Sequence, residues 1–260
     1  MIYHNILDAM GHTPMVQLRR MVPEGAARVL VKYEGLNVGG SIKTRVAYNM
    51  VMEAVRQGKI TKDTIIVEPT SGNQGIGLAL IGAVRGYRVR IIMPDSVSEE
   101  RRKLVRHYGA EVKLIHDAGD IGACIEECLQ TALKLKAKNP NVFVPQQFAN
   151  PANPATHIDT TAEEIWRDTD GKVDIFVAGV GTGGTVSGTG LGLKAHNPNV
   201  KIVAVEPDAS PMISEGRAAP HMIQGIGANF VPDTFNRDAV DEVIRVTDYD
   251  AIRTSRMLSQ

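Results

Sequence analysis

The stretch "TIIVEPTSGNQGIGLALIGAVRGYRVRIIMP", residues 64–94, decides the fold class of this chain. It begins and ends with short apolar runs of strand length, and between them apolar residues recur at helical spacing behind a polar loop. A strand, a helix and a second strand in this order form a βαβ unit, whose two strands lie parallel in one sheet. The sequence therefore predicts an α/β protein.

The same alternation continues along the chain. Strand-like runs recur at residues 111–116, 142–148, 173–180 and 201–207, and helix-like patterns lie at 98–110, 121–137, 160–169 and 186–198. Residues 14–20 and 27–34 instead predict a pair of strands. Two Asn-Pro dipeptides interrupt the rhythm in "ANPANPATH", residues 149–157, where we expect a domain boundary.

The composition excludes several classes of function. Lysine and arginine together number 29, as do aspartate and glutamate, so no net charge attracts nucleic acid. No apolar run has the length of a membrane span, and polar residues interrupt the N-terminus, so we expect a cytoplasmic protein without membrane contact. Cys124 and Cys128 lie four apart on a predicted helix without further metal-ligand residues nearby, which predicts free thiols and no metal site.

The stretch "GGSIKTR", residues 39–45, places a lysine at the start of a predicted helix. Ser41 fits the N-cap position, and Lys43 then lies in the first turn, where the helix dipole disfavours an ammonium charge. One interpretation is a surface lysine whose stem reaches water. The other is an amine that the protein holds uncharged.

A second stretch, "VDIFVAGVGTGGTVSG", residues 173–188, leads from a strand through a glycine-rich loop into a helix. Free loop amides at a helix N-terminus form a phosphate cradle. Gly179, Gly181 and Gly184 also match the dinucleotide pattern G-x-G-x-x-G, with Glu206 as its acidic residue. The glycines could equally serve a tight strand-to-helix turn.

The polar loop of the opening stretch, residues 70–75, carries hydroxyl and amide donors on Thr70, Ser71, Asn73 and Gln74. These donors suit a carboxylate or a second anion, although helix capping alone would also explain them. Three such loops, one with a lysine and two suited to anions, together predict pyridoxal phosphate, because a lysine amine forms a Schiff base with this cofactor.

Six segments also carry a family resemblance. In order, "GGSIKTR", "TSGNQGIGLA", "QQFANPANP", "GVGTGGTVSG", "VAVEP" and "HMIQGIGANF" resemble the cysteine synthase (O-acetylserine sulfhydrylase) family of fold-type II pyridoxal-phosphate enzymes. The resemblance implies a tryptophan synthase beta-like fold of two three-layer αβα domains with mostly parallel sheets. It assigns residues 1–36 and 148–260 to a larger domain for the cofactor phosphate, and residues 37–147 to a smaller mobile domain for the substrate carboxylate.

The resemblance also assigns roles to residues. Lys43 carries the cofactor and later moves the α-proton of the substrate, and Asn73 contacts the ring hydroxyl. The residues that hold the cofactor phosphate are Gly181, Thr182, Gly183, Gly184 and Thr185. Those that bind the substrate are Thr70, Ser71, Gly72, Asn73, Gln74 and Gln147, with Gly225, Ile226 and Gly227 at the mouth of the site.

The implied reaction is β-replacement, in which an amino acid loses its β-leaving group, forms an aminoacrylate and gains a thiol or sulfide. The implied partners are a small amino acid, sulfide or a thiol, a second subunit in a homodimer, and the C-terminal peptide of a serine acetyltransferase.

Three alternatives stay open. Segments "GLALIGAVRGYR" and "HIDTTAEEIW" also resemble cystathionine β-synthase, which uses homocysteine as nucleophile. A non-catalytic relative that binds a partner's C-terminal peptide is a second alternative, and an NAD-dependent dehydrogenase built on the glycine pattern is the third.

The sequence departs from the family pattern at its end. Relatives continue past "AIRTSRMLSQ", residues 251–260, into a strand and a loop whose serine hydrogen-bonds the pyridine nitrogen. We therefore expect the cofactor domain to be incomplete at its C-terminus, with one sheet edge uncovered.

Overall fold

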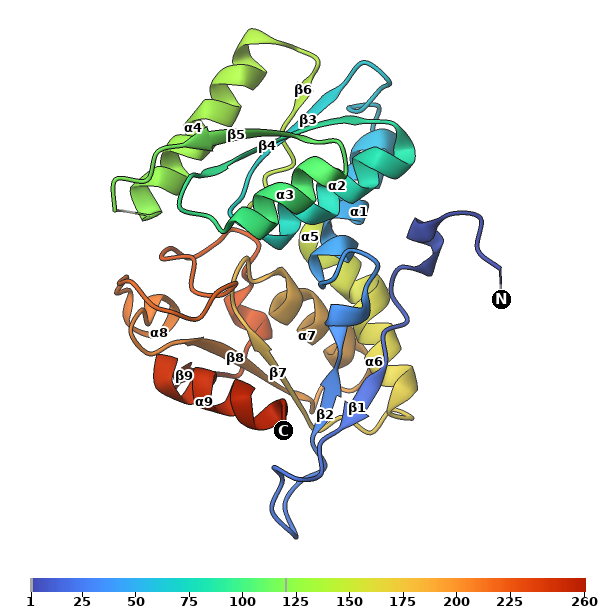
Figure 1. Cartoon of the computed structure of the whole chain (residues 1–260). Helices are drawn as coiled ribbons and strands as arrows, with labels where there is room; N and C mark the ends of the chain where they lie inside the picture. Colours follow the sequence, from blue (N-terminus) through green and yellow to red (C-terminus); the bar gives the residue numbers. More distant parts are fainter. Residues whose placement is uncertain (1, 120) are drawn as a thin grey trace. The chain divides into compact units, whose positions relative to one another are not determined.

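The computed structural model describes residues 2–119 and 121–260 (Figure 1). Its contacts divide the chain into two units of equal length. Unit 1 comprises Met1–Gly11 and Glu34–Ala152, and unit 2 comprises His12–Tyr33 and Asn153–Gln260. The division thus falls inside the Asn-Pro stretch and places residues 1–11 in unit 1, whereas the resemblance groups residues 1–36 with 148–260.

Unit 1 contains a four-stranded parallel sheet in the order β5-β4-β3-β6. Its strands are β3 (Ile65–Pro69), β4 (Arg88–Pro94), β5 (Glu111–Ile115) and β6 (Val142–Phe143). Its helices are α1 (Lys43–Arg56), α2 (Asn73–Arg85), α3 (Glu99–His107) and α4 (Ile121–Lys138), with 3-10 turns η1 (Ile6–Ala9) and η2 (Glu34–Leu36). Residues 64–94 form β3, α2 and β4, which confirms the predicted βαβ unit.

Apolar side chains cover both faces of the unit 1 sheet. Consecutive strand residues point to opposite faces, so Ile66 packs with residues of α1, α2 and α3, while Val67 packs with α4. Figure 1 shows α4 on one side of this sheet and α1 to α3 on the other. Unit 1 therefore has the predicted three layers. Cys124 and Cys128 of α4 are buried and free, and desolvation raises the pKa of the Cys128 thiol to about 12.

Unit 2 contains two sheets. Strands β1 (Met15–Gln17) and β2 (Leu30–Lys32) pair antiparallel, as predicted, and β7 (Ile175–Gly179), β8 (Lys201–Pro207) and β9 (Glu242–Val246) form a parallel sheet in chain order. Its helices are α6 (Glu163–Asp168), α7 (Gly184–His196), α8 (Met212–Glu215) and α9 (Asp248–Leu258), with the 3-10 turn η4 (Arg237–Ala239). Helix α5 (Ala152–Thr156) begins on the last residue of unit 1, and a π-helix, η3 (His157–Ala162), joins it to α6.

The two faces of the parallel sheet in unit 2 differ. One face packs against α6 and α7 through a cluster that includes Leu193 and Ile202, both fully buried. On strand β7, the side chains of Ile175 and Val177 are 57% and 56% exposed. Within the described residues, the second face of β7 is therefore open to solvent.

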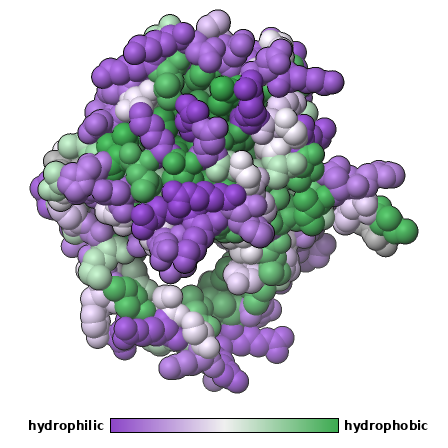
Figure 2. Space-filling view, turned by 45° about the horizontal axis from the view of Figure 1, so that its top comes forward, coloured by the Kyte–Doolittle hydropathy of each residue, from purple (hydrophilic) through white to green (hydrophobic). Residues whose placement is uncertain are grey.

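The surface is mixed in polarity. Figure 2 shows hydrophilic residues over most of one face of the molecule, with hydrophobic patches between them. Among the described residues, no helix combines the length and the hydropathy that crossing a membrane requires.

Candidate active site

Lys43 is the first residue of α1 and is partly buried. Desolvation of the ammonium form lowers the pKa of its amine to about 8. Its backbone N–H donates a hydrogen bond to Ser41 Oγ at 3.3 Å, although Ile42, and not Ser41 as predicted, occupies the N-cap position. The structure thus provides an amine of which roughly a quarter is neutral at pH 7.5, a far larger fraction than in a solvated lysine.

A buried ion pair anchors the segment before Lys43. Arg45, 1% exposed, donates hydrogen bonds from Nε and Nη2 to the two carboxylate oxygens of Glu34, both at 2.9 Å. Asn37 Nδ2 donates to the same carboxylate, and Asn37 Oδ1 accepts from the Gly11 N–H. These bonds fix the chain on both sides of Lys43. Sequence reasoning missed this network, since nothing in the spacing pairs Arg45 with Glu34.

Helix α2 packs closely against α1 beside Lys43. A Cβ atom at Gly77 would lie 3.1 Å from the Lys43 carbonyl oxygen and 3.0 Å from the Ala47 Cβ. Because Gly77 lies in the second turn of α2, the start of α2 and the start of α1 are close together. The structure thereby brings Lys43 near the polar loop Thr70–Gly75, so two of the three loops from which the cofactor was predicted lie close together. The positive ends of both helix dipoles favour an anion there.

The polar loop contains a buried amide with unused hydrogen-bonding capacity. Gln74 is 1% exposed, and neither its Oε1 nor its Nε2 has a hydrogen-bond partner among the described residues. A buried polar group without a partner costs ~1–3 kcal/mol, which makes such groups candidates for ligand contacts. Thr70 Oγ1 accepts the Gly72 N–H at 3.2 Å, which closes the turn before α2.

A buried carboxylate, that of Glu68, holds the backbone of Gln147 near the polar loop. Glu68 of β3 is fully buried, and its two oxygens accept the backbone N–H groups of Gln146 and Gln147 at 2.9 and 3.0 Å. Desolvation raises the pKa of Glu68 to about 7, although the two hydrogen bonds act in the opposite direction. Sequence reasoning did not select Glu68; the available signal was a charged residue inside the apolar run "TIIVEP".

In unit 2, the glycine-rich loop forms the start of α7. Gly183 has a φ of 79°, which favours glycine, and α7 begins at Gly184. Asn153 Nδ2 donates to Thr182 Oγ1 at 3.0 Å, and the Nε2 of the buried His157 lies 3.4 Å from Thr185 Oγ1. Two loop hydroxyls are therefore held from α5 and η3 beside the helix N-terminus, which suits a phosphate. No pattern in the sequence indicated that His157 contacts this loop.

The predicted mouth segment, residues 225–227, lies against this loop. A Cβ atom at Gly181 would approach the Gly225 carbonyl oxygen to 2.4 Å, and the Gly227 N–H donates to the Val180 carbonyl at 2.9 Å. A Cβ at Gly179 would meet Ile226 at 2.8 Å. The glycines of the loop therefore allow two backbone segments to approach each other, and the structure brings both predicted sets together.

The acidic residue of the dinucleotide pattern has another use. Glu206 is 2% exposed, and its carboxylate accepts the backbone N–H groups of Ile213 and Ser214 at 2.7 and 3.1 Å as well as the Ser214 hydroxyl. These bonds hold the start of α8. The dehydrogenase interpretation is wrong on this point, because the carboxylate is engaged within the protein and does not present itself to a ribose.

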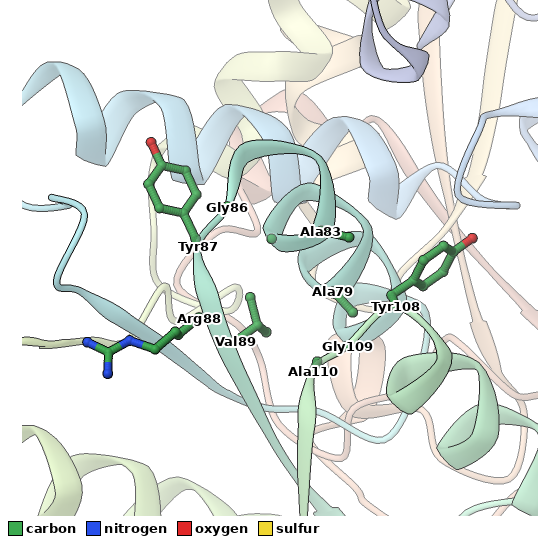
Figure 3. Close-up of a pocket in the computed structure, with 10 residues that line it drawn as sticks. Ala79, Ala83, Gly86, Tyr87, Arg88, Val89, Tyr108, Gly109 and Ala110 are labelled. Carbon is green, nitrogen blue, oxygen red and sulfur yellow. The ribbon is translucent and has the colours of Figure 1, made fainter.

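A surface depression of about 280 Å³ lies elsewhere in unit 1 (Figure 3). It is formed where α2 ends, β4 begins and α3 leads into β5, with Tyr87 and Tyr108 at its sides. None of the predicted site residues lines it.

Known proteins resemble this chain over nearly its whole length. The model of the family "Pyridoxal-phosphate dependent enzyme" matches residues 6–260. A cysteine synthase of Staphylococcus aureus is 46% identical over 98% of this chain and 81% of its own length. A hydrogen sulfide-producing enzyme from Fusobacterium nucleatum superposes with a TM-score of 0.93 at 43% identity, covering 100% of this chain and 84% of that chain. A cysteine synthase from Entamoeba histolytica has a TM-score of 0.93 at 42% identity, covering 98% and 76%.

Proposed function

The chain belongs to the cysteine synthase family of pyridoxal-phosphate-dependent enzymes, and from this membership we propose that it converts O-acetyl-L-serine, or a similar β-substituted alanine, and sulfide into L-cysteine. The observation that carries the proposal is the position of Lys43. An amine with a pKa of about 8 lies at the start of α1, next to the start of α2 and its loop of neutral donors. The arrangement suits a covalent cofactor and an amino-acid carboxylate.

The residues present fit pyridoxal phosphate. Lys43 supplies the amine for its aldehyde, and the loop Gly181–Thr185 supplies a helix N-terminus with hydroxyls held by Asn153 and His157 for its phosphate. We assign Asn73, at the first position of α2, to the ring hydroxyl. When bound, the cofactor withdraws electrons from the substrate α-carbon and so makes the α-proton acidic.

The protein's own groups then divide the work. Lys43 Nζ removes the α-proton, which requires the amine to be neutral, and the low pKa provides that form. The carboxylate of the amino acid binds to the donors of loop Thr70–Gln74 and to Gln147. Gln74 supports this assignment because a carboxylate would satisfy its buried Nε2. We assign Gly225–Gly227, which border the phosphate loop, to the mouth of the site.

The identity of the nucleophile distinguishes two activities within this reaction class. Homocysteine in place of sulfide would make the enzyme a cystathionine β-synthase. The Fusobacterium relative is described as hydrogen sulfide-producing, which favours testing sulfide release from cysteine as a second activity.

We also propose that the protein forms a homodimer in the cytoplasm. A further proposed ligand is the C-terminal peptide of a serine acetyltransferase, whose carboxylate would compete with the substrate at Thr70–Gln74.

The test uses purified protein with added pyridoxal phosphate. O-Acetyl-L-serine with sulfide should give cysteine, measured by mass spectrometry, and Lys43→Ala should lose both this activity and the visible absorption band of the bound cofactor. Lys59→Ala, a change at an exposed lysine of the same unit, should retain both. Faster product formation with homocysteine would identify the alternative nucleophile, and a visible band without turnover would support the non-catalytic relative.

A further inference from the structure

Glu68 places a carboxyl group in the interior of unit 1, where no lysine or arginine of residues 2–119 and 121–260 forms an ion pair with it. It lies on the same face of β3 as Ile66, the face that α1 and α2 cover. Burying a carboxylate is unfavourable unless hydrogen bonds stabilise it. A neutral apolar residue would pack at this position more readily. What a carboxylate adds here is the ability to accept hydrogen bonds.

The hydrogen bonds of the Glu68 side chain link β3 to the segment after β6, beyond the point where the two strands stop pairing. Strand β6 pairs with β3 at only two positions, the second being Ile66 with Phe143. Two residues further on, the register would place Pro145 opposite Glu68, and proline has no N–H to donate. The Glu68 carboxylate takes the next two N–H groups, those of Gln146 and Gln147.

The segment that Glu68 holds has an unusual backbone. Gln146 has a φ of 58°, the left-handed region that a non-glycine residue adopts only at some cost. A left-handed residue lets successive N–H groups converge on one anion. The turn is closed independently, because the Gln146 carbonyl accepts the N–H groups of Ala149 and Asn150. The carboxylate therefore sets the position of the turn relative to β3.

We propose that Glu68 is a positioning residue for the amino-acid substrate: through two backbone hydrogen bonds it fixes Gln147 beside the strand end that leads into the loop Thr70–Gln74. This inference rests on the proposed function. Glu68 then positions both parts of the proposed substrate-carboxylate site. It precedes the loop Thr70–Gln74 by two residues in the chain, and its side chain binds the backbone N–H of Gln147.

The test variant is Glu68→Gln, which preserves the volume but turns an NH2 group toward one of the two backbone amides. We expect the KM for O-acetyl-L-serine to rise roughly 10-fold, with kcat and the affinity for pyridoxal phosphate nearly unchanged. Gln147→Ala should raise the same KM, and adding Glu68→Gln to it should change KM by no more than about twofold, because both act through one side chain. If Glu68→Gln does not fold, Glu68→Asp retains the charge but draws it back from the amides, and the same rise in KM is expected.

The chain provides a matched control in Glu206. It too is a buried glutamate at the next-to-last position of a parallel strand, it precedes a proline, and it accepts two consecutive backbone N–H groups, but these belong to α8 and not to a predicted site segment. Glu206→Gln should lower thermal stability and leave the KM for O-acetyl-L-serine within about twofold. Equal KM effects of the two variants, or effects of Glu68→Gln and Gln147→Ala that multiply, would overturn the positioning role while the wild type still makes cysteine. A wild type that makes no cysteine would overturn the proposed function, and this inference with it.

Discussion

The low pKa of Lys43 predicts how its reactivity depends on pH. With a pKa of about 8, roughly a quarter of the amine is neutral at pH 7.5. A solvated lysine, with a pKa of ~10.4, is neutral to only about 0.1% at that pH. The Lys43 site should therefore contain roughly 200 times more neutral amine than an exposed lysine.

Competitive labelling of the cofactor-free protein with limiting acetic anhydride measures this property without any turnover. Acetylation at each lysine, read by peptide mass spectrometry from pH 6 to pH 11, follows its neutral fraction. We expect a midpoint near pH 8 for Lys43, because desolvation disfavours the ammonium form. Exposed lysines in the same digest, such as Lys113, provide the internal reference.

A midpoint for Lys43 at or above pH 10 would refute the reasoning, since the amine would then be charged at physiological pH. The bound cofactor could still depend on Lys43 in that case, but the protein would not have prepared the amine for it. A low midpoint that persists after unfolding in urea would also contradict the argument, because desolvation requires the folded surroundings.

Of three further predictions, two concern stability and the third concerns the affinity for the cofactor. Between pH 4.5 and 7 the folded state keeps the Glu68 proton that the unfolded state releases, so this group should reduce the free energy of unfolding by ~3 kcal/mol as the pH rises. Glu68→Gln should lack this pH-dependent loss in urea unfolding. If the difference in unfolding free energy between variant and wild type is the same at every pH, the prediction is wrong. Glu34→Gln removes the charge that pairs with the buried Arg45 and should cost ~3 kcal/mol in urea unfolding; an unchanged midpoint would mean that solvent reaches the guanidinium. Gly188→Ala would place a Cβ atom 2.1 Å from the Pro154 carbonyl oxygen, so α7 must shift. Because the phosphate loop forms the start of α7, the affinity for pyridoxal phosphate in an absorbance titration should fall at least about fivefold. An unchanged affinity would show that the phosphate loop moves independently of α7.

The sequence predicted the features of the fold that depend on local periodicity. Apolar runs and helical spacing identified the βαβ unit of residues 64–94, and the strand pair β1–β2 followed from the same kind of pattern. The boundary of α1 was wrong by one residue at its cap, since Ile42 and not Ser41 takes that position. Helix ends depend on the packing of a single turn, which periodicity does not resolve.

The site could be predicted only in part, because its support comes from contacts between distant segments. The polar loop and Lys43 were recognisable from residue type, but their closeness depends on Gly77, which admits the backbone of α1. Arg45 and His157 were not selected, because their partners are set by tertiary packing. For Glu206 the sequence suggested a role that the structure does not support. Its spacing from the glycine loop suited a ribose contact, but its carboxylate accepts hydrogen bonds from the nearby N–H groups of Ile213 and Ser214.

The pair Glu68 and Glu206 shows where local sequence stops being informative. Both follow a valine and precede a proline at the end of a buried parallel strand, and both bind two consecutive backbone N–H groups. The partners of Glu206 lie 7 and 8 residues away, whereas those of Glu68 lie 78 and 79 residues away. A nearby partner makes such a carboxylate a helix-capping group, and a distant one makes it a link between two parts of a site. The motif Val-Glu-Pro therefore predicts the hydrogen-bond pattern, but only the fold determines whether that pattern acts on stability alone or also on the substrate.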